Sequence, residues 1–168
     1  MQIGIPKETQ QDERRVAATP ETVKKLVAMG HAVLVQKEAG LGSCIRDDDY
    51  AAAGATLVGD AAELLGKSDI VLKVRGPDEK ELTLLKSGAI VIGLLAPGDK
   101  GRIETYARKG LTCFSLELLP RITRAQAMDV LSSQANIAGY KSVLVAADKY
   151  CRHFPMLILQ PSIRSIRR

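Results

Sequence analysis

Short, unbroken apolar runs constrain the fold of this chain more than any other feature of its sequence. Three of them recur at residues 69–74, 89–95 and 111–116, and segments with helical signals separate them. Continuous apolar strands that alternate with helices are typical of a parallel sheet covered on both faces. We therefore predict an α/β fold, a Rossmann-like or flavodoxin-like parallel sheet of about five strands with helices on both faces.

Helix and turn signals fill the spaces between these runs. Thr19, Pro20 and Glu21 supply an N-cap, a first-turn proline and an acid for a helix that stops at Gly30. Gly66 is predicted to end a later helix in the same way. The remaining strands are predicted at residues 2–5, 31–35 and 56–58, and the remaining helices at 47–53, 60–65, 78–85 and 100–109.

Composition and charge exclude several classes of function. Aromatic residues make up only 4% of the 168 residues and Trp is absent, which argues against a surface that stacks nucleic-acid bases. Four of the 24 basic residues lie in 152–168, which has no acid, so the rest carries 20 basic against 19 acidic side chains. The body of the domain is nearly neutral, and we predict no nucleic-acid partner.

The cysteines, the histidines and the hydropathy pattern point to a cytoplasmic protein without a metal. Cys44, Cys113 and Cys151 are widely spaced, and only two histidines are present, so neither zinc nor a disulfide framework is indicated. Cys113 lies in an apolar run and is predicted to be a small buried residue. No signal peptide is visible and no apolar run approaches ~20 residues, so we predict that the chain neither spans a membrane nor is exported.

Residues 120–140 carry the most unusual polar pattern in the chain. If an unbroken helix begins at Thr123, whose spacing to Gln126 is that of a capping box, the polar side chains of the segment share one face. Alternatively, Ser132 or Ser133 caps a second, longer helix and residues 121–131 form a turn or loop. Either arrangement gathers Arg121, Gln126 and Asp129 near a helix N-terminus, where a fixed cation and backbone N–H groups favour an anion. From the pattern alone, a solvated helix face is the simpler interpretation.

Three candidate positions, of which this segment is one, lie where predicted strands end, which is where ligands bind in such sheets. They are the loop after Ile5, the turn at residues 73–77 and the loop after Leu116, and they could converge on one cleft. Lys73 ends an apolar strand, so its side chain must snorkel to solvent, pair with an acid or serve a ligand. Arg75 is predicted to be a surface residue, and Arg14 and Arg15 a solvated charge pair. The sequence Gly40-Leu41-Gly42 lacks the third glycine of a phosphate loop and carries no weight.

Several motifs occur in the same order in one known family. They are Ile3-Gly4-Ile5-Pro6-Lys7-Glu8, Arg15-Val16-Ala17-Ala18-Thr19-Pro20, Leu72-Lys73-Val74, the pattern R-x4-Q-x2-D-x2-S that begins at Arg121, and Asn136-Ile137-Ala138-Gly139-Tyr140. On these motifs the chain resembles the N-terminal domain of the alpha subunit of proton-translocating NAD(P) transhydrogenase, a domain shared with alanine dehydrogenases. The likeness extends from residue 3 to about residue 156 and covers nearly the whole chain.

The resemblance implies a function and a set of partners. In that family, NAD(H) lies in a cleft between two domains of the alpha subunit, a separate beta subunit presents NADP(H), and a membrane domain couples hydride transfer to proton movement. Arg121, Gln126, Asp129 and Ser132 would be the cofactor-binding residues, and Gln126 and Asp129 would orient the nicotinamide for transfer. A homodimer, no direct membrane insertion and a cytoplasmic location, or one peripheral to the inner membrane through partner subunits, are implied as well.

The sequence also departs from the family pattern. The G-x-G-x-x-G fingerprint that opens the family's second, NAD-binding domain is absent, and residues 151–168 read as a divergent basic tail after a family-like domain at 1–150. We therefore expect the isolated chain to be inactive as a transhydrogenase. An alanine dehydrogenase-like fragment ranks lower: Arg15 and Lys73 match its substrate residues, but Leu94 stands where that branch needs a histidine. A third hypothesis is a non-catalytic α/β module that binds no nucleotide tightly.

Overall fold

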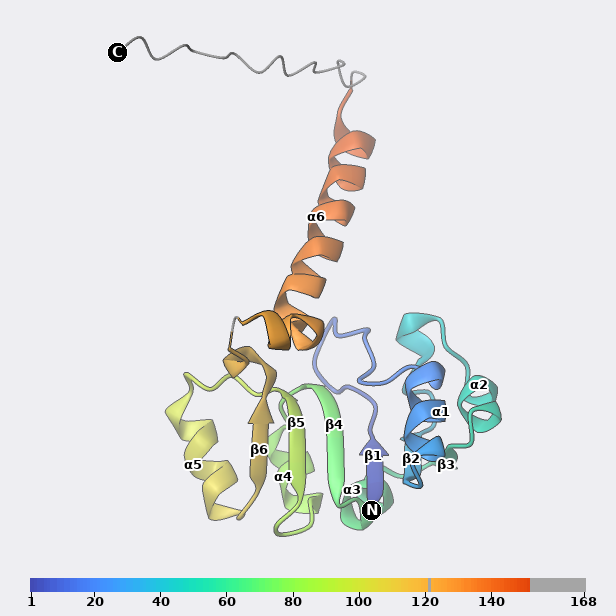
Figure 1. Ribbon diagram of the computed structural model, residues 1–168, viewed down its shortest axis with the longest axis vertical. Coiled ribbons are helices and arrows are strands. Elements are labelled where there is room, and N and C mark those ends of the chain that lie inside the picture. The colour runs from blue at the N-terminus through green and yellow to red at the C-terminus, as the bar shows by residue number, and fades with distance from the viewer. Residues whose placement is uncertain (121, 152–168) are drawn as a thin grey trace. The chain divides into compact units, whose positions relative to one another are not determined.

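The computed structural model describes residues 1–120 and 122–151, which divide into two compact units at Asp129/Val130. The first unit, Met1–Asp129, holds every strand of the described residues (Figure 1). Of the second unit, the helix α6 (Val130–Lys149) is described. Apart from Cys151, the predicted basic tail lies outside the described residues.

The first unit is built on one parallel sheet of six strands in the order β3-β2-β1-β4-β5-β6. The strands are β1 (Gln2–Ile5), β2 (Ala32–Gln36), β3 (Thr56–Val58), β4 (Ile70–Arg75), β5 (Ile90–Leu94) and β6 (Thr112–Ser115). The order reverses between β1 and β4, as it does in Rossmann folds. The predicted α/β class is therefore confirmed, and the Rossmann alternative holds over the flavodoxin one. The sheet of about five strands has six, and they lie at the six predicted positions.

Helices pack on both faces of this sheet and define two apolar cores. The helices are α1 (Pro20–Ala28), α2 (Asp47–Ala52), α3 (Ala61–Lys67), α4 (Glu79–Leu84) and α5 (Lys100–Arg108). Val23 of α1 and Tyr50 of α2 pack with Ile5 and Val35 on one face. The other core belongs to α3, α4 and α5, and its members include Leu64, Leu82, Tyr106, Val71 and Val91. Figure 1 shows α4 behind β5, on this second side of the sheet.

Acidic and hydroxyl side chains fix the helix starts. Thr19 accepts a hydrogen bond from the Thr22 N–H at 3.4 Å, as its predicted N-cap role requires, and Asp60 does the same for Ala62 at 3.1 Å. One helix end differs from the expectation. Gly66 does not stop α3, which continues to Lys67, because a single glycine costs only about 1 kcal/mol inside a helix.

Neither alternative predicted for residues 121–131 is correct as stated. Residues Thr123–Met128 form a 3-10 helix, η3, whose N-cap is Ile122 and has no side-chain hydrogen bond. Thr123 therefore does not start a capping box. The helix α6 begins at Val130, so Ser132 and Ser133 lie inside its first turn instead of capping it.

Cys113 also departs from its prediction, since its side chain is exposed. It lies on β6, which ends the strand order and has the burial pattern of an edge strand. An apolar run cannot by itself distinguish an edge strand from a central one. In the part of the chain that the structure describes, no helix combines the length and the apolar character needed to cross a membrane.

Candidate functional site

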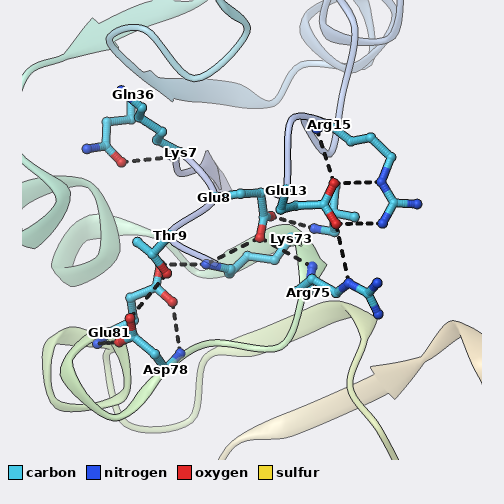
Figure 2. Close-up of polar contacts among 11 residues, drawn as sticks. Lys7, Glu8, Thr9, Glu13, Arg15, Gln36, Lys73, Arg75, Asp78 and Glu81 are labelled. Carbon is cyan, nitrogen blue, oxygen red and sulfur yellow. Dashed lines mark hydrogen bonds and ion pairs between the residues drawn. The ribbon is translucent and has the colours of Figure 1, made fainter. Parts of the chain in front are cut away.

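The carboxyl end of β4 is joined to the loop after β1 by one carboxylate. Glu8 Oε1 accepts a hydrogen bond from the Val74 N–H at 2.7 Å, and Oε2 accepts one from the Arg75 N–H at 3.3 Å (Figure 2). Two consecutive backbone donors at the end of a parallel strand are thus satisfied by a side chain from a neighbouring strand's loop. This contact brings two of the three predicted strand-end segments together.

Lys73 lies at the centre of a buried group of charges. Its Nζ lies 2.5 Å from Glu81 Oε1 and 3.8 Å from Glu8 Oε2, and the three side chains are 1%, 6% and 2% exposed in that order. Glu81 reaches this position because it is the third helical residue of α4: its Oε2 accepts from the Asp78 N–H at 2.9 Å, and Asp78 Oδ1 accepts from the Glu81 N–H at 2.8 Å. Of the three roles left open for Lys73, the structure shows pairing with acids.

Burial dominates the protonation of Glu8. It raises the pKa of the Glu8 carboxyl above its usual value, against the smaller opposing effects of the Lys73 ammonium and the two backbone N–H groups. Two carboxylates share one ammonium here, and Glu8 binds a proton more readily than an exposed glutamate does. We call Glu8, Lys73 and Glu81 the buried cluster.

A second, more open group of charges lies beside the buried cluster. Glu13 Oε1 accepts from Arg15 Nε at 2.7 Å, and Glu13 Oε2 contacts Arg15 Nη2 at 2.6 Å and Arg75 Nε at 3.3 Å (Figure 2). These contacts, the Arg15 hydrogen bond above all, lower the pKa of Glu13 to about 2. Arg15 is half-buried in this pair, so the prediction of a solvated pair with Arg14 is wrong for Arg15, whereas Arg75 is exposed as predicted.

The residues that follow β5 donate hydrogen bonds to another carboxylate, which comes from the segment after β6. Glu117 lies on the short 3-10 helix η2 (Leu116–Leu118) and accepts from the Leu95 N–H at 3.1 Å and the Ala96 N–H at 2.9 Å. Ser115 Oγ also hydrogen-bonds Glu117. Burial alone would raise the pKa of Glu117, but these hydrogen bonds together lower it. They hold Ala96 at a φ of 53°, which is uncommon for a residue other than glycine.

All three predicted strand-end segments contribute to one cavity of about 290 Å³ at the carboxyl edge of the sheet. The residues that line it are Gln10, Arg75, Gly76, Leu94, Ala96, Asp99, Arg102 and Glu117. Two arginines, two acids and Gln10 line a small space whose other walls are Gly76, Leu94 and Ala96. Such a cavity can take a flat polar group, and it is too small for a whole dinucleotide, since drug-sized ligands occupy roughly 300–1,000 Å³.

In the described part of the chain, the four residues predicted from the 120–140 pattern are not among those that line this cavity. Gln126 is exposed on η3, and Asp129 is half-buried at the end of the first unit. Ser132 belongs to the second unit, on α6, and Arg121 lies outside the described residues. Their role at a nucleotide site stays a prediction.

Sequence reasoning did not single out Glu8, Glu13, Glu81 or Glu117. One signal was present: Asp78 and Glu81 have the D-x-x-E spacing of a capping box, which places the Glu81 side chain at the start of α4. The partners of the other three lie far along the chain, 66 residues in the case of Glu8 and Val74, and no local pattern encodes such pairs.

The strand order and the cavity at the carboxyl edge define a Rossmann-like α/β domain of the kind that binds a ligand beyond its strand ends. More particularly, the chain belongs to the alanine dehydrogenase/PNT N-terminal domain family, which matches residues 4–138. This confirms the resemblance seen in the sequence motifs.

Known proteins of both branches of the family are similar to this chain. It is 44% identical over 164 residues to the first portion of the NAD(P) transhydrogenase alpha subunit of Rhodospirillum rubrum, a match that covers 94% of this chain and 43% of that protein. Alanine dehydrogenase of Mycobacterium tuberculosis is 36% identical, over 88% of this chain and 39% of that protein.

Solved structures show the same two branches. The transhydrogenase from Sinorhizobium meliloti superposes with a TM-score of 0.88 at 49% identity, over 94% of this chain and 47% of that one. An L-alanine dehydrogenase superposes with a TM-score of 0.81 at 32% identity, over 88% and 40%. The chain therefore spans less than half the length of each of these proteins.

Proposed function

We propose that this chain acts as the first domain of a transhydrogenase alpha subunit and forms one wall of an NAD(H) site. Hydride would pass there between NAD(H) and an NADP(H) held by a beta subunit, coupled to proton translocation by a membrane domain. The higher identity to the transhydrogenases, 44% and 49% against 36% and 32% for the alanine dehydrogenases, supports this branch. A homodimer and a cytoplasmic location, or one peripheral to the membrane through those partners, belong to the same proposal.

The side chain at position 94 supports the choice between the two branches. Leu94 ends β5 and lines the 290 Å³ cavity. By the resemblance, it stands where the alanine dehydrogenase branch needs a histidine to transfer a proton to the 2-oxo group. An aliphatic side chain cannot donate or accept that proton. Direct hydride transfer between two nicotinamides needs no such group, because the bound cofactors supply the reacting atoms.

The described residues fit the nicotinamide end of the cofactor better than its phosphates. The cavity has the size of one flat ring with a polar substituent, and the side chains of Arg75 and Arg102 in its lining can hydrogen-bond a carboxamide. NADH supplies the hydride when it is bound. In this proposal Arg121, Gln126, Asp129 and Ser132, which do not line the cavity in the described part of the chain, complete the NAD(H) site from outside it, and Gln126 and Asp129 orient the ring for transfer.

The test uses a completed subunit, in which residues 1–150 of this chain replace the matching segment of the Rhodospirillum rubrum protein. We expect it to transfer hydride between NADH and an NADP(H) acceptor in the presence of a beta subunit. The 168-residue chain by itself should show no turnover, with these cofactors or with alanine and NAD. Oxidation of alanine by the completed subunit, or an inactive but folded one, would contradict the assignment.

A further inference from the structure

A groove between α4 and α5 holds a cavity of about 590 Å³, about twice the volume of the one at the carboxyl edge of the sheet. The helix α4 and its N-cap contribute Asp78, Glu79 and Leu82 to its lining, and α5 and its N-cap contribute Asp99, Arg102 and Tyr106. We call this cavity the α4/α5 groove. Of its lining residues, Asp99 and Arg102 also line the smaller cavity, and the proposed nucleotide site uses none of the others.

Tyr106, which lines this groove, has a buried hydroxyl without a hydrogen-bond partner. The residue is 5% exposed, and no hydrogen bond links its Oη to any of the described residues. The other buried tyrosine differs, since Tyr50 Oη donates to the Ala18 carbonyl oxygen at 2.8 Å. Folded proteins rarely bury a hydroxyl in this state, because it gives up its hydrogen bonds to water and gains none. Tyr106 therefore indicates an acceptor that the described residues do not supply.

A second donor lies close to this hydroxyl. A Cβ placed on Gly76 would stand 2.7 Å from Tyr106 Oη and 3.4 Å from Arg102 Nη1, so the two atoms converge beside this glycine. A guanidinium has no acceptor, so Arg102 cannot accept a hydrogen bond from the hydroxyl. Burial raises the pKa of Tyr106, against the smaller opposing effect of the Arg102 guanidinium, and the phenol therefore keeps its proton at neutral pH. Two neighbouring donors thus call for an acceptor that carries negative charge.

The charges and the apolar side chains of the groove decide which anion fits it. Asp78 and Asp99 each accept a backbone N–H of the helix that they cap, at 2.8 and 3.3 Å, and Glu79 is exposed. These three acids outnumber the two arginines of the lining, so they oppose a doubly charged anion such as phosphate. A carboxylate carries a single charge and matches the planar donors of a guanidinium. Pro77 and Leu82 add apolar surface, against which a short carbon chain can pack.

We infer that the α4/α5 groove binds a small monocarboxylate with a short apolar chain. Tyr106 Oη and the Arg102 guanidinium donate hydrogen bonds to the carboxylate oxygens, and the carbon chain lies along Leu82. The volume of about 590 Å³ is sufficient, since pockets for small molecules measure roughly 300–1,000 Å³. Binding here requires neither a nucleotide nor hydride transfer, so it does not depend on the proposed function.

An NMR titration of the isotope-labelled 168-residue chain with sodium hexanoate, at constant ionic strength, tests this. We expect saturable shifts of the Gly76, Arg102 and Tyr106 amide signals. Hexanamide, which lacks the charge, and inorganic phosphate, which carries a second one, should bind at least about tenfold more weakly. Tyr106→Phe and Arg102→Met each remove one donor and should weaken hexanoate binding at least about tenfold. Lys100→Met is the matched control, because it removes a cation of α5 that does not line the groove, and its hexanoate binding should equal wild type.

Thermal unfolding without any ligand gives an independent readout. Tyr106→Phe should melt no lower than wild type, since it removes an unsatisfied hydroxyl, whereas Tyr50→Phe should melt lower, because it removes a hydrogen bond. Equal losses in the two variants would show that water already satisfies the Tyr106 hydroxyl, and this overturns the inference. Hexanoate shifts that spare Gly76, Arg102 and Tyr106, hexanoate binding that folded Tyr106→Phe leaves unchanged, or tighter binding of phosphate overturn it as well. Since no nucleotide is present, none of these results bears on hydride transfer.

Discussion

The buried cluster and the 3-10 helix η3 both carry polar side chains, but they differ in how deeply these side chains are buried. Lys73, Glu8 and Glu81 are at most 6% exposed, and their contacts join three separate segments of the first unit. In η3 only Ala125 is buried, and no side chain caps its start. The cluster is completed by folding and must contribute to stability. The polar residues of η3 contribute little to it, so their chemistry is free to serve a ligand or a partner.

Removing the cation of the buried cluster should have the largest effect. Lys73→Met leaves two buried carboxylates without their ammonium and should lower the free energy of unfolding by about 3–5 kcal/mol. Urea unfolding at neutral pH measures it. Lys67→Met is the control, because the exposed Lys67–Glu63 pair should contribute no more than about 0.5 kcal/mol. Equal losses in the two variants would remove the distinction between buried and exposed pairs.

The two acids near the end of β4 should give stability profiles of opposite sign with pH. The pKa of Glu13 is lowered to about 2, so its contribution is present above its unfolded value of 4.5 and is lost as the pH falls from there toward 2. Glu13→Gln should remove about 1–2 kcal/mol of stability at pH 7, less than the full shift because solvent screens Arg15.

The pKa of Glu8 is raised, so its contribution is present below 4.5 and is lost as the pH rises through the folded value. The wild-type protein should therefore lose stability as the pH rises above 4.5, and Glu8→Gln should abolish that loss. Glu13→Gln should instead abolish the loss that the wild-type protein shows as the pH falls below 4.5. Urea midpoints measured across this range for both variants and wild type test the signs. Parallel profiles for the two variants would contradict the burial of Glu8.

Replacing Gln126 should lower the rate of hydride transfer. In the completed subunit, Gln126→Ala should slow hydride transfer at least about tenfold at saturating NADH, because a misoriented ring acts on the transition state. Arg121→Ala should in addition weaken NADH binding, since a fixed cation is lost. Stopped-flow transfer rates decide this. Rates equal to wild type would remove residues 121–132 from the site.

The smallest expected effect is that of the same substitution on stability. Gln126→Ala should change the free energy of unfolding of the 168-residue chain by no more than about 0.5 kcal/mol, because its side chain is exposed on η3. Thermal and urea unfolding measure it. A loss comparable to that of Glu13→Gln would show that η3 is part of the folded core and not a segment free for function.

Local patterns predicted the sheet well and its polar contacts poorly. The apolar runs located β4, β5 and β6, and the Thr19-Pro20 pair located the start of α1, because strand and cap signals are local. Cys113 was misplaced, since its exposure depends on β6 being the last strand of the sheet, which is a property of topology.

Local sequence patterns also failed to predict the contacts of the candidate site. Lys73 was noticed because a charge at the end of an apolar strand needs an explanation, but its two acids come from α4 and from the loop after β1. The start of α6 was misjudged by three or four residues, since a serine is tolerated in a first helical turn although the cap is the position that it favours. Register, edge position and distant pairs are decided by the assembled sheet.

Glu8 and Glu117 occupy backbone N–H groups that could otherwise bind a phosphate. In many α/β proteins the unpaired N–H groups at the carboxyl edge of the sheet receive the phosphates of a nucleotide. Here the last two N–H groups of β4, and the first two after β5, already bind a carboxylate of the protein itself. A phosphate brought to either position would find its donors taken and a negative charge in its place. These four N–H groups therefore offer no anion site to a pyrophosphate, which would need the side chains of Arg75 and Arg102 at this edge instead.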